Sequence, residues 1–175
     1  MWINHRRVSH TRRHEWRPIC DGPLAMLRQT VDDAVFFFMT VDEAEAGYPT
    51  AHEHLSQLLF WHREYLGIAR ALAHGERPTL RGGTLAQLNR LGVQASEHQP
   101  LSVLAQQLAE VQDQLEEALR ALPDWQIPFP VKQGGRPRTV ERRVRAIEAQ
   151  LRHHLERLAR ARQQAVPAVP IPAHR

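Results

Sequence analysis

The sequence predicts an all-α fold in which four long amphipathic helices pack as a four-helix bundle. Apolar residues recur every three to four positions in four long segments, and no segment has the apolar–polar alternation of a β-strand. The links after the second and third segments are long, which argues against a simple up-down bundle with equal loops. At 175 residues, the chain is suited to one domain with a substantial core.

The first long helix is predicted over residues 21–46. Asp21 is the expected N-cap, and Pro23 would lie in the first turn, where its missing N–H costs nothing. Gly47 is expected to end the helix. The residues that share its apolar face are Leu24, Leu27, Val31, Val35 and Phe38.

The second long helix is predicted from Thr50 to about Gly75. Thr50 and Glu53 have the spacing of a capping box at its start. A helix of about 24 residues spans roughly 36 Å. Its apolar stripe contains Leu55, Leu58, Leu59, Trp61, His62, Tyr65, Leu66, Ile68, Ala69 and Leu72.

Three further segments lead to the last helix. Residues 76–83 form a loop, and Thr84 begins a shorter helical segment that Gly92 is expected to interrupt. Pro100 begins the third long helix, which extends to about residue 122 with a leucine-rich face. A connection rich in proline follows over 123–138, and its apolar residues Trp125, Ile127 and Phe129 should cover the bundle end or form a lid over a pocket.

The fourth long helix is predicted from Thr139, as its cap, to residue 164. Val140, Val144, Ile147, Leu151, Leu155 and Leu158 form its apolar stripe. Its many arginines alternate with glutamates, and Glu141–Arg145 and Arg152–Glu156 have the spacing of ion pairs along a helix. This pattern favours a solvated face over a nucleic-acid surface, because no aromatic residues or known nucleic-acid motif accompany it.

The two ends of the chain are predicted to lie outside the bundle domain of residues 21–164. Residues 1–20 form a basic arm, expected to be disordered, with five arginines against Glu15; this surplus of four equals the net charge of the whole chain. The arm has the composition of an over-extended start or, as a less favoured alternative, of an organellar transit peptide. Residues 165–175 form a proline-rich tail that is also expected to be disordered.

Composition excludes several classes of protein. No apolar run approaches the roughly 20 residues that cross a bilayer, so we expect no membrane association. Cys20 is the single cysteine, so no disulfide forms within the chain, and a reducing cytoplasm is the natural location.

Histidines are conspicuous on the second and fourth helices. His54 and His62 lie eight residues apart, about 12 Å along a helix, which is too far for both to bind one metal ion. His52 and His153 are expected in solvent, whereas His154 adjoins the apolar stripe and should point inward.

Four segments together resemble the DinB superfamily of four-helix bundles, and most closely its ClbS/DfsB branch. They are TAHEHLSQLLFWHREYL at 50–66, GTLAQLN at 83–89, ALPDW at 121–125 and RTVERRVRAIEAQLRHHLERL at 138–158. The resemblance extends over about 24–160. It rests on the order and spacing of the four segments, because no single segment is diagnostic.

The resemblance implies that the metal site of the family is degenerate here. Metal-binding members use one histidine on the second helix and an H-x-x-x-H pair on the fourth. These positions correspond to Gln57, Gln150 and His154, so one of three ligands remains. An amide oxygen is a poor ligand for Ni²⁺ or Zn²⁺ beside imidazole, so we expect no metal or other cofactor.

The remaining polar residues should converge if the helices pack as in the family. Gln57 and Trp61 share one helix face, and Gln150 and His154 share another. They could form a hydrogen-bond network that fixes helix register or line a ligand pocket, with Tyr65 and His54 as further ligand-binding residues. His154 is the best candidate catalytic base, because a histidine ordinarily titrates near neutrality.

The resemblance implies a bundle that binds or hydrolyses an electrophilic small molecule, without metal. Whether it is an enzyme stays open, because no carboxylate or nucleophile completes the set. One alternative is a non-catalytic binding or dimerisation module, with a homodimer as one possible state. A second alternative is a metal-dependent enzyme of the DinB type, such as a thiol transferase.

Overall fold

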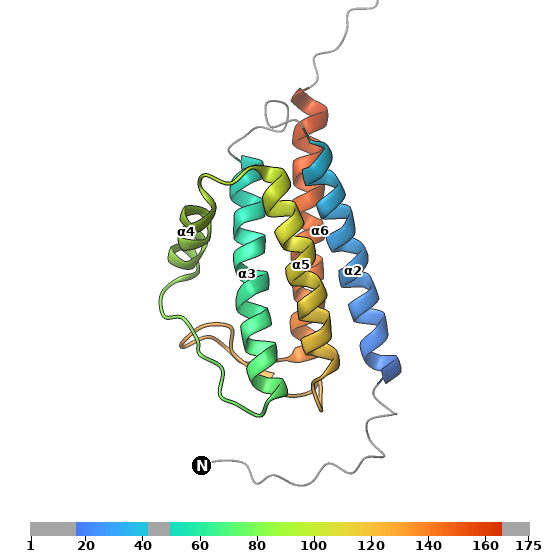
Figure 1. Ribbon diagram of the computed structural model, residues 1–175, viewed down its shortest axis with the longest axis vertical. Helices are drawn as coiled ribbons and strands as arrows, with labels where there is room; N and C mark the ends of the chain where they lie inside the picture. The colour runs from blue at the N-terminus through green and yellow to red at the C-terminus, as the bar shows by residue number, and fades with distance from the viewer. Residues whose placement is uncertain (1–16, 42–49, 166–175) are drawn as a thin grey trace, which may run out of the picture.

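The computed structural model describes residues 17–41 and 50–165, and this part of the chain is mostly helical (Figure 1). Its elements are α2 (Arg17–Thr40), α3 (Thr50–Ala73), α4 (Leu85–Ser96), α5 (Leu101–Arg120), β1 (Pro128–Phe129), β2 (Arg138–Thr139) and α6 (Val140–Ala165). The predicted all-α class is confirmed for these residues. The predictions for residues 1–16, 42–49 and 166–175 lie outside them, and Gly47 is among those residues.

The four long helices α2, α3, α5 and α6 lie side by side (Figure 1). α2 and α6 run in one direction along the molecule, whereas α3 and α5 run in the other. Two successive long helices, α3 and α5, can be parallel because the link that contains α4 returns along the outside of α3. The long second link expected from the sequence is therefore what sets the chain topology.

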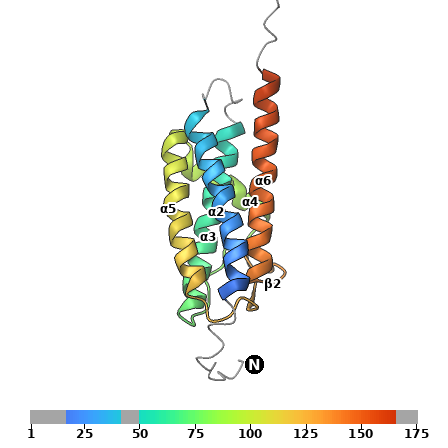
Figure 2. The ribbon, with the colours of Figure 1, turned by 90° about the vertical axis from the view of Figure 1, so that its right-hand side faces the viewer.

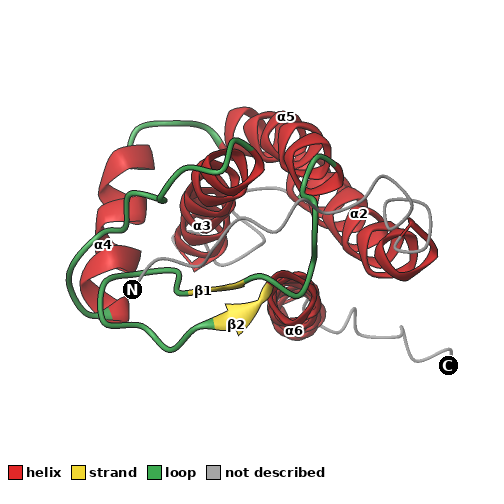
Figure 3. Ribbon diagram, turned by 90° about the horizontal axis from the view of Figure 1, so that it is seen from below, coloured by secondary structure: helices red, strands yellow, loops and turns green. Residues whose placement is uncertain are grey.

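The four long helices are not packed equally around a central axis. α5 packs against α3 and α2, and α2 also packs against α6, as the turned view shows (Figure 2). In contrast, the backbones of α3 and α6 come close at few points, and the pair β1–β2 lies between these helices at one end (Figure 3). We call this boundary between α3 and α6 the seam.

Both ends of α2 differ from the predicted range of 21–46, because the helix already ends at Thr40. The helix begins at Arg17 and not after Asp21, so Pro23 lies inside it. Asp21 is not an N-cap; its carboxylate forms an ion pair with Arg120 on α5, with 2.9 Å between Oδ1 and Nη1. Pro23 and Leu24, inside the helix, are buried.

The end of α3 agrees with the prediction. Gly75 adopts a φ of 73°, a conformation that costs glycine little. The N–H of Glu76 donates to the carbonyl of Ala71 at 2.8 Å, and that of Gly75 donates to Leu72 at 3.1 Å. These two bonds form a Schellman motif and satisfy carbonyls at the helix end.

Helix α4 is continuous through Gly92, so the predicted interruption there is wrong. Thr84 caps α4 together with Gln87 in a reciprocal capping box. Gly92 is buried against α3, where an added Cβ would lie 2.7 Å from Cβ of Phe60 and 3.4 Å from the carbonyl oxygen of Ser56. The glycine thus permits close contact between two helices and does not break one.

Replacing Gly92 with alanine should weaken the docking of α4 on α3. Gly67, on the exposed side of α3, provides a matched control because nothing lies within 4 Å of its added Cβ. Gly67→Ala should raise the free energy of unfolding by about 0.5–1 kcal/mol through helix propensity. Gly92→Ala should be less stable than Gly67→Ala by about 1–3 kcal/mol in urea unfolding, because the helix must move away from Phe60. Equal effects of the two substitutions would contradict the close packing.

The connection between α5 and α6 closes the lower end of the four helices. Trp125 is 2% exposed, and its indole Nε1–H donates to the carbonyl of Leu119 at 3.0 Å. The N–H of Glu141, at the start of α6, donates to the carbonyl of Trp125 at 3.3 Å. β1 and β2 pair antiparallel, with Phe129 opposite Arg138, and Phe129 is also buried. Of the two predicted roles, covering the end of the helices is the one these residues adopt.

The outer face of α6 is solvated, with ion pairs along the helix. Arg145 pairs with Glu141 at 3.0 Å, as predicted. Arg152 pairs with Glu148 at 3.5 Å and not with the predicted Glu156. Glu148 is nearly buried, and it also accepts a hydrogen bond from Thr30 on α2, so the α2–α6 contact draws this carboxylate inward.

Candidate functional site

A small polar cavity lies at the seam. Its wall contains Gln57, Leu58, Trp61, His62 and Tyr65 from α3, Asn89 from α4, and Ile147, Gln150 and His154 from α6. We call it the seam pocket. Its volume is about 20 Å³, and about 10–15 Å³ is the minimum for one water molecule. The cavity therefore has room for about one water molecule.

Five of the six residues expected to bind a ligand or act in catalysis lie in this wall. They are Gln57, Trp61, Tyr65, Gln150 and His154; Gln150 is exposed and lies at the rim. His54 is the exception, because it does not line the pocket. Its ring packs against that of His154, with 4.7 Å between the ring centroids.

Trp61 connects the pocket to α4. Its indole N–H donates to Oδ1 of Asn89 at 2.8 Å, so this donor is already paired within the protein. The rings of Trp61 and Tyr65 lie 6.3 Å apart by their centroids. The Trp61–Asn89 hydrogen bond therefore orients the indole ring and holds α4 beside the pocket.

The two glutamines do not form the predicted hydrogen-bond network. Within residues 17–41 and 50–165, neither Gln57 nor Gln150 hydrogen-bonds to His154 or to the other glutamine. Their amide groups can therefore bind water or a ligand without breaking an interaction among these three side chains.

His62 is a pocket residue that we did not predict as a site residue. It is 1% exposed, and its Nδ1 lies 2.9 Å from the carbonyl oxygen of Leu58. A carbonyl only accepts, so Nδ1 carries the proton and Nε2 is the basic nitrogen. Nε2 is sealed from solvent and has no hydrogen-bond partner in the described part of the protein. Burial lowers the pKa of His62 to about 4, so the ring is neutral at pH 7.

The sequence did contain a signal for His62. Leu58, His62 and Leu66 follow one another at intervals of four, which places them on one helix face. Both leucines are buried, and the histidine between them is buried as well. We placed His62 in the apolar stripe of this helix but did not expect it among the residues that bind a ligand.

His154 lies in the pocket wall but is a weaker base than expected. Burial, and then the nearby His54, His153 and Arg157, lower its pKa to about 4. The expectation that His154 titrates near neutrality is therefore wrong. Its Nδ1 has no partner among the described residues, and the same is true of Nδ1 of His54, whose pKa is also lowered, mainly by burial. The ring of His154 is a neutral hydrogen-bonding group at pH 7.

His52 and His153 have contrasting positions. His153 is exposed, as expected. His52 is 4% exposed, so the expectation that it lies in solvent is wrong. Its Nε2–H donates to the carbonyl of Gln99 at 3.0 Å, and Ser56 Oγ lies 3.4 Å from its Nδ1. The link before α5 covers this histidine, and a pattern confined to one helix cannot reveal that.

The described residues contain no group of three His, Cys, Asp or Glu side chains placed to hold a metal ion. The wall of the seam pocket also contains no carboxylate and no thiol. What the pocket offers is amide groups, a phenol and two neutral imidazoles. These groups can donate and accept hydrogen bonds.

The fold and the pocket define the class of protein: a helical protein with a polar cavity between two long helices. Comparisons of the chain with protein-family models, with curated proteins and with solved structures give no match. In the part of the chain that the structure describes, no helix has the length and apolar character needed to cross a membrane.

Proposed function

We propose that the chain is a four-helix bundle of the DinB type, close to the ClbS/DfsB branch, that binds an electrophilic or otherwise polar small molecule in the seam pocket. The four helices α2, α3, α5 and α6 form the bundle, and the long links are those that carry α4 and the β1–β2 pair. Binding takes place without a metal, in the cytoplasm that the lone Cys20 favours.

One observation carries the proposal: Nε2 of His62 is buried without a hydrogen-bond partner among the described residues, and His62 lines a cavity that also has two glutamine side chains in its wall. Buried polar atoms are nearly always hydrogen-bonded in proteins, so an unpaired one in a cavity calls for a ligand group or water. His62 Nε2 accepts a hydrogen bond, so the bound group has an N–H or O–H donor.

The geometry supports binding better than hydrolysis. A general base works best when its pKa lies near the working pH, and both histidines of the pocket have a pKa of about 4. No carboxylate or thiol in the wall is placed to act as a nucleophile. Any catalytic role of His154 would require ligand binding to raise its pKa.

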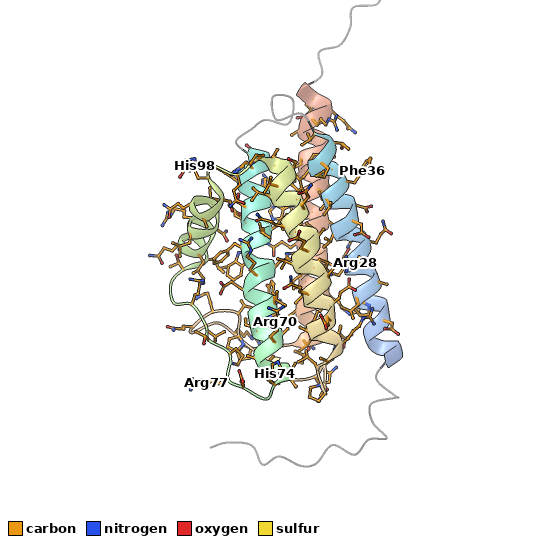
Figure 4. All side chains as sticks on the ribbon, in the orientation of Figure 1. Arg28, Phe36, Arg70, His74, Arg77 and His98 are labelled. Carbon is orange, nitrogen blue, oxygen red and sulfur yellow. The ribbon has the colours of Figure 1, made fainter. Side chains whose placement is uncertain are left out.

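The proposal predicts that ligand-induced stabilisation depends on the pocket histidines. We would screen small electrophiles and thiols by thermal shift against wild type, His62→Asn, His154→Ala and the surface control His74→Ala; His74 lies near the end of α3 (Figure 4). A ligand at 100 times its Kd stabilises by about 2.7 kcal/mol, which raises Tm by several degrees. That rise should persist in His74→Ala and largely disappear in the two pocket variants.

Equal shifts in all four proteins would argue against the seam pocket. Two other results would favour the alternatives. Stoichiometric Ni, Zn, Mn or Fe in protein purified without a histidine tag would favour a metal-dependent enzyme. No shift with any compound would favour the non-catalytic module, which the small volume of the pocket also favours.

A further inference from the structure

Basic and acidic residues are segregated along the chain. Residues 132–162, which include β2 and most of α6, contain ten arginine and lysine residues against three glutamates. Residues 21–131 contain seven basic residues against 15 acidic residues. The last helix and the turn before it are therefore strongly basic, whereas the preceding helices together are acidic.

Four arginines of α6 lie on one outer face of the helix. They are Arg142, Arg145, Arg152 and Arg160, and all four are exposed. Since a helix turns by about 100° per residue, these positions lie within a sector of about 80°. From the first to the last, the row is about 27 Å long. We call it the basic stripe.

The glutamates of α6 offset only part of this charge. Glu148 is 6% exposed and Glu141 is half-buried, and each forms an ion pair with one arginine of the stripe. Glu156 is the exposed glutamate of α6. Neither Arg142 nor Arg160 forms an ion pair with any residue that the structure describes. Surface ion pairs are weak, so an anion of high charge density can displace the paired carboxylates.

The opposite side of the molecule carries acidic residues. α5 and α6 lie on opposite sides when the helices are viewed end-on (Figure 3). Glu110, Asp113 and Glu117 on α5 are exposed. Like-charge repulsion disfavours the approach of a polyanion from that side, so the charge distribution orients a polyanion toward α6.

The stripe suits a phosphate backbone better than a membrane surface. The guanidinium group of arginine pairs with two oxygens of one phosphate. A single row of cations matches the charges repeated along a nucleic-acid strand, whereas lipid headgroups form a plane. Among the described residues, the exposed large apolar side chains lie on α2, α4 and α5, and none lies on α6. No apolar side chain beside the stripe is therefore placed to enter a bilayer.

Binding to a phosphate backbone needs neither aromatic residues nor a nucleic-acid motif. The sequence pattern favoured a solvated face because both are absent. Arginine contacts to phosphates nevertheless supply affinity through the release of counterions, and they carry no information on base sequence.

We propose that the basic stripe of α6 binds the phosphate backbone of nucleic acid without sequence preference. This surface is separate from the seam pocket, because Gln150 and His154 lie outside the sector of the stripe. The inference goes beyond the proposed function, and each can fail without the other.

The test measures fluorescence anisotropy of a labelled DNA duplex of about 20 base pairs with the full chain, at a series of salt concentrations. If each of the four arginines contacts one phosphate, log K should fall with log salt at a slope of about −3.6. Binding should therefore weaken about 100-fold between about 50 and 200 mM salt. A second duplex of unrelated sequence should bind equally well.

The double variant Arg142→Gln/Arg160→Gln removes two charges of the stripe that have no ion pair. Its slope should be less steep by about 1.8, and its affinity at low salt should fall about tenfold or more. Arg63→Gln/Arg90→Gln is the matched control, because both arginines are exposed, lie on α3 and α4, and carry the same charge. This control should keep the wild-type slope. Urea unfolding of each variant establishes that it is folded.

Four results would overturn the inference. An equal loss of affinity in the two double variants would show that only net charge matters. Unchanged binding in Arg142→Gln/Arg160→Gln would assign binding to another basic segment, such as residues 1–20. Tighter binding to vesicles that contain phosphatidylserine than to DNA would assign the stripe to a membrane. Self-association at low salt that the stripe variant loses, without DNA binding, would assign the stripe to a second copy of the chain.

Discussion

Acidification from pH 7 to about pH 4 should destabilise the protein, with His62 alone contributing about 3 kcal/mol. The pKa of His62 falls from an ordinary value of 6.5 to about 4 in the folded protein. Below pH 6.5 the unfolded chain binds a proton at this histidine and the folded chain does not, so stability is lost as the pH falls toward 4. One unit of pKa difference corresponds to about 1.4 kcal/mol, which gives the magnitude. His154 acts in the same direction, but its half-exposed ring makes its contribution smaller.

Urea unfolding at a series of pH values measures this effect. His62→Asn retains an N–H donor for the carbonyl of Leu58 but cannot titrate, so its stability should depend less on pH between 6.5 and 4. Carboxylates that titrate in the same pH range contribute equally to the free energy of unfolding of the variant and the wild type. Their contribution therefore cancels when one free energy is subtracted from the other. The exposed His74→Asn is the control and should keep the wild-type slope. A wild-type slope in His62→Asn would mean that this ring is accessible to protons.

Replacing Trp125 with alanine should lower the free energy of unfolding by about 3–5 kcal/mol, because a large buried aromatic side chain leaves a cavity. Trp125 holds the ends of two helices together: its indole N–H binds the carbonyl of Leu119 on α5, and its own carbonyl accepts from Glu141 on α6. Urea unfolding of wild type and variant measures the loss.

Trp125→Phe separates packing from hydrogen bonding. Phenylalanine keeps most of the apolar contact but leaves the buried carbonyl of Leu119 without its donor, so we expect a smaller loss, of about 1–3 kcal/mol. Gln126→Ala, at the exposed neighbouring position, should change stability by less than about 0.5 kcal/mol. A Trp125→Ala variant as stable as wild type would mean that the connection does not hold α5 and α6.

The helices could be predicted from the sequence where apolar residues recur at helical spacing along the whole segment. The stripes of α3, α5 and α6 gave these helices within a few residues, because burial of one face dominates local preferences. Predictions from single capping or helix-breaking residues were wrong where contacts between helices determine the role of the residue. Asp21 looked like a cap but pairs with Arg120, and Gly92 looked like a break but lies at a contact with Phe60.

The candidate site was predicted in part for the same reason. Helix geometry and the family resemblance together placed Gln57, Trp61, Gln150 and His154 near one another, and the structure brings these four side chains to one cavity. Sequence spacing could not predict that the link before α5 buries His52 or that Nδ1 of His62 binds Leu58. Nor could it predict that desolvation lowers the pKa of His154, because that depends on which side chains from other helices surround the ring.

Helix α4 packs chiefly on α3, and the Trp61–Asn89 hydrogen bond joins it to the pocket wall. A short helix held on one side can detach while the four long helices remain folded, because each cooperative unit of a protein opens with its own free energy. If the seam pocket binds a ligand as proposed, detachment of α4 would widen access to it. The rate of ligand entry and the rate of amide exchange in α4 would then rise together.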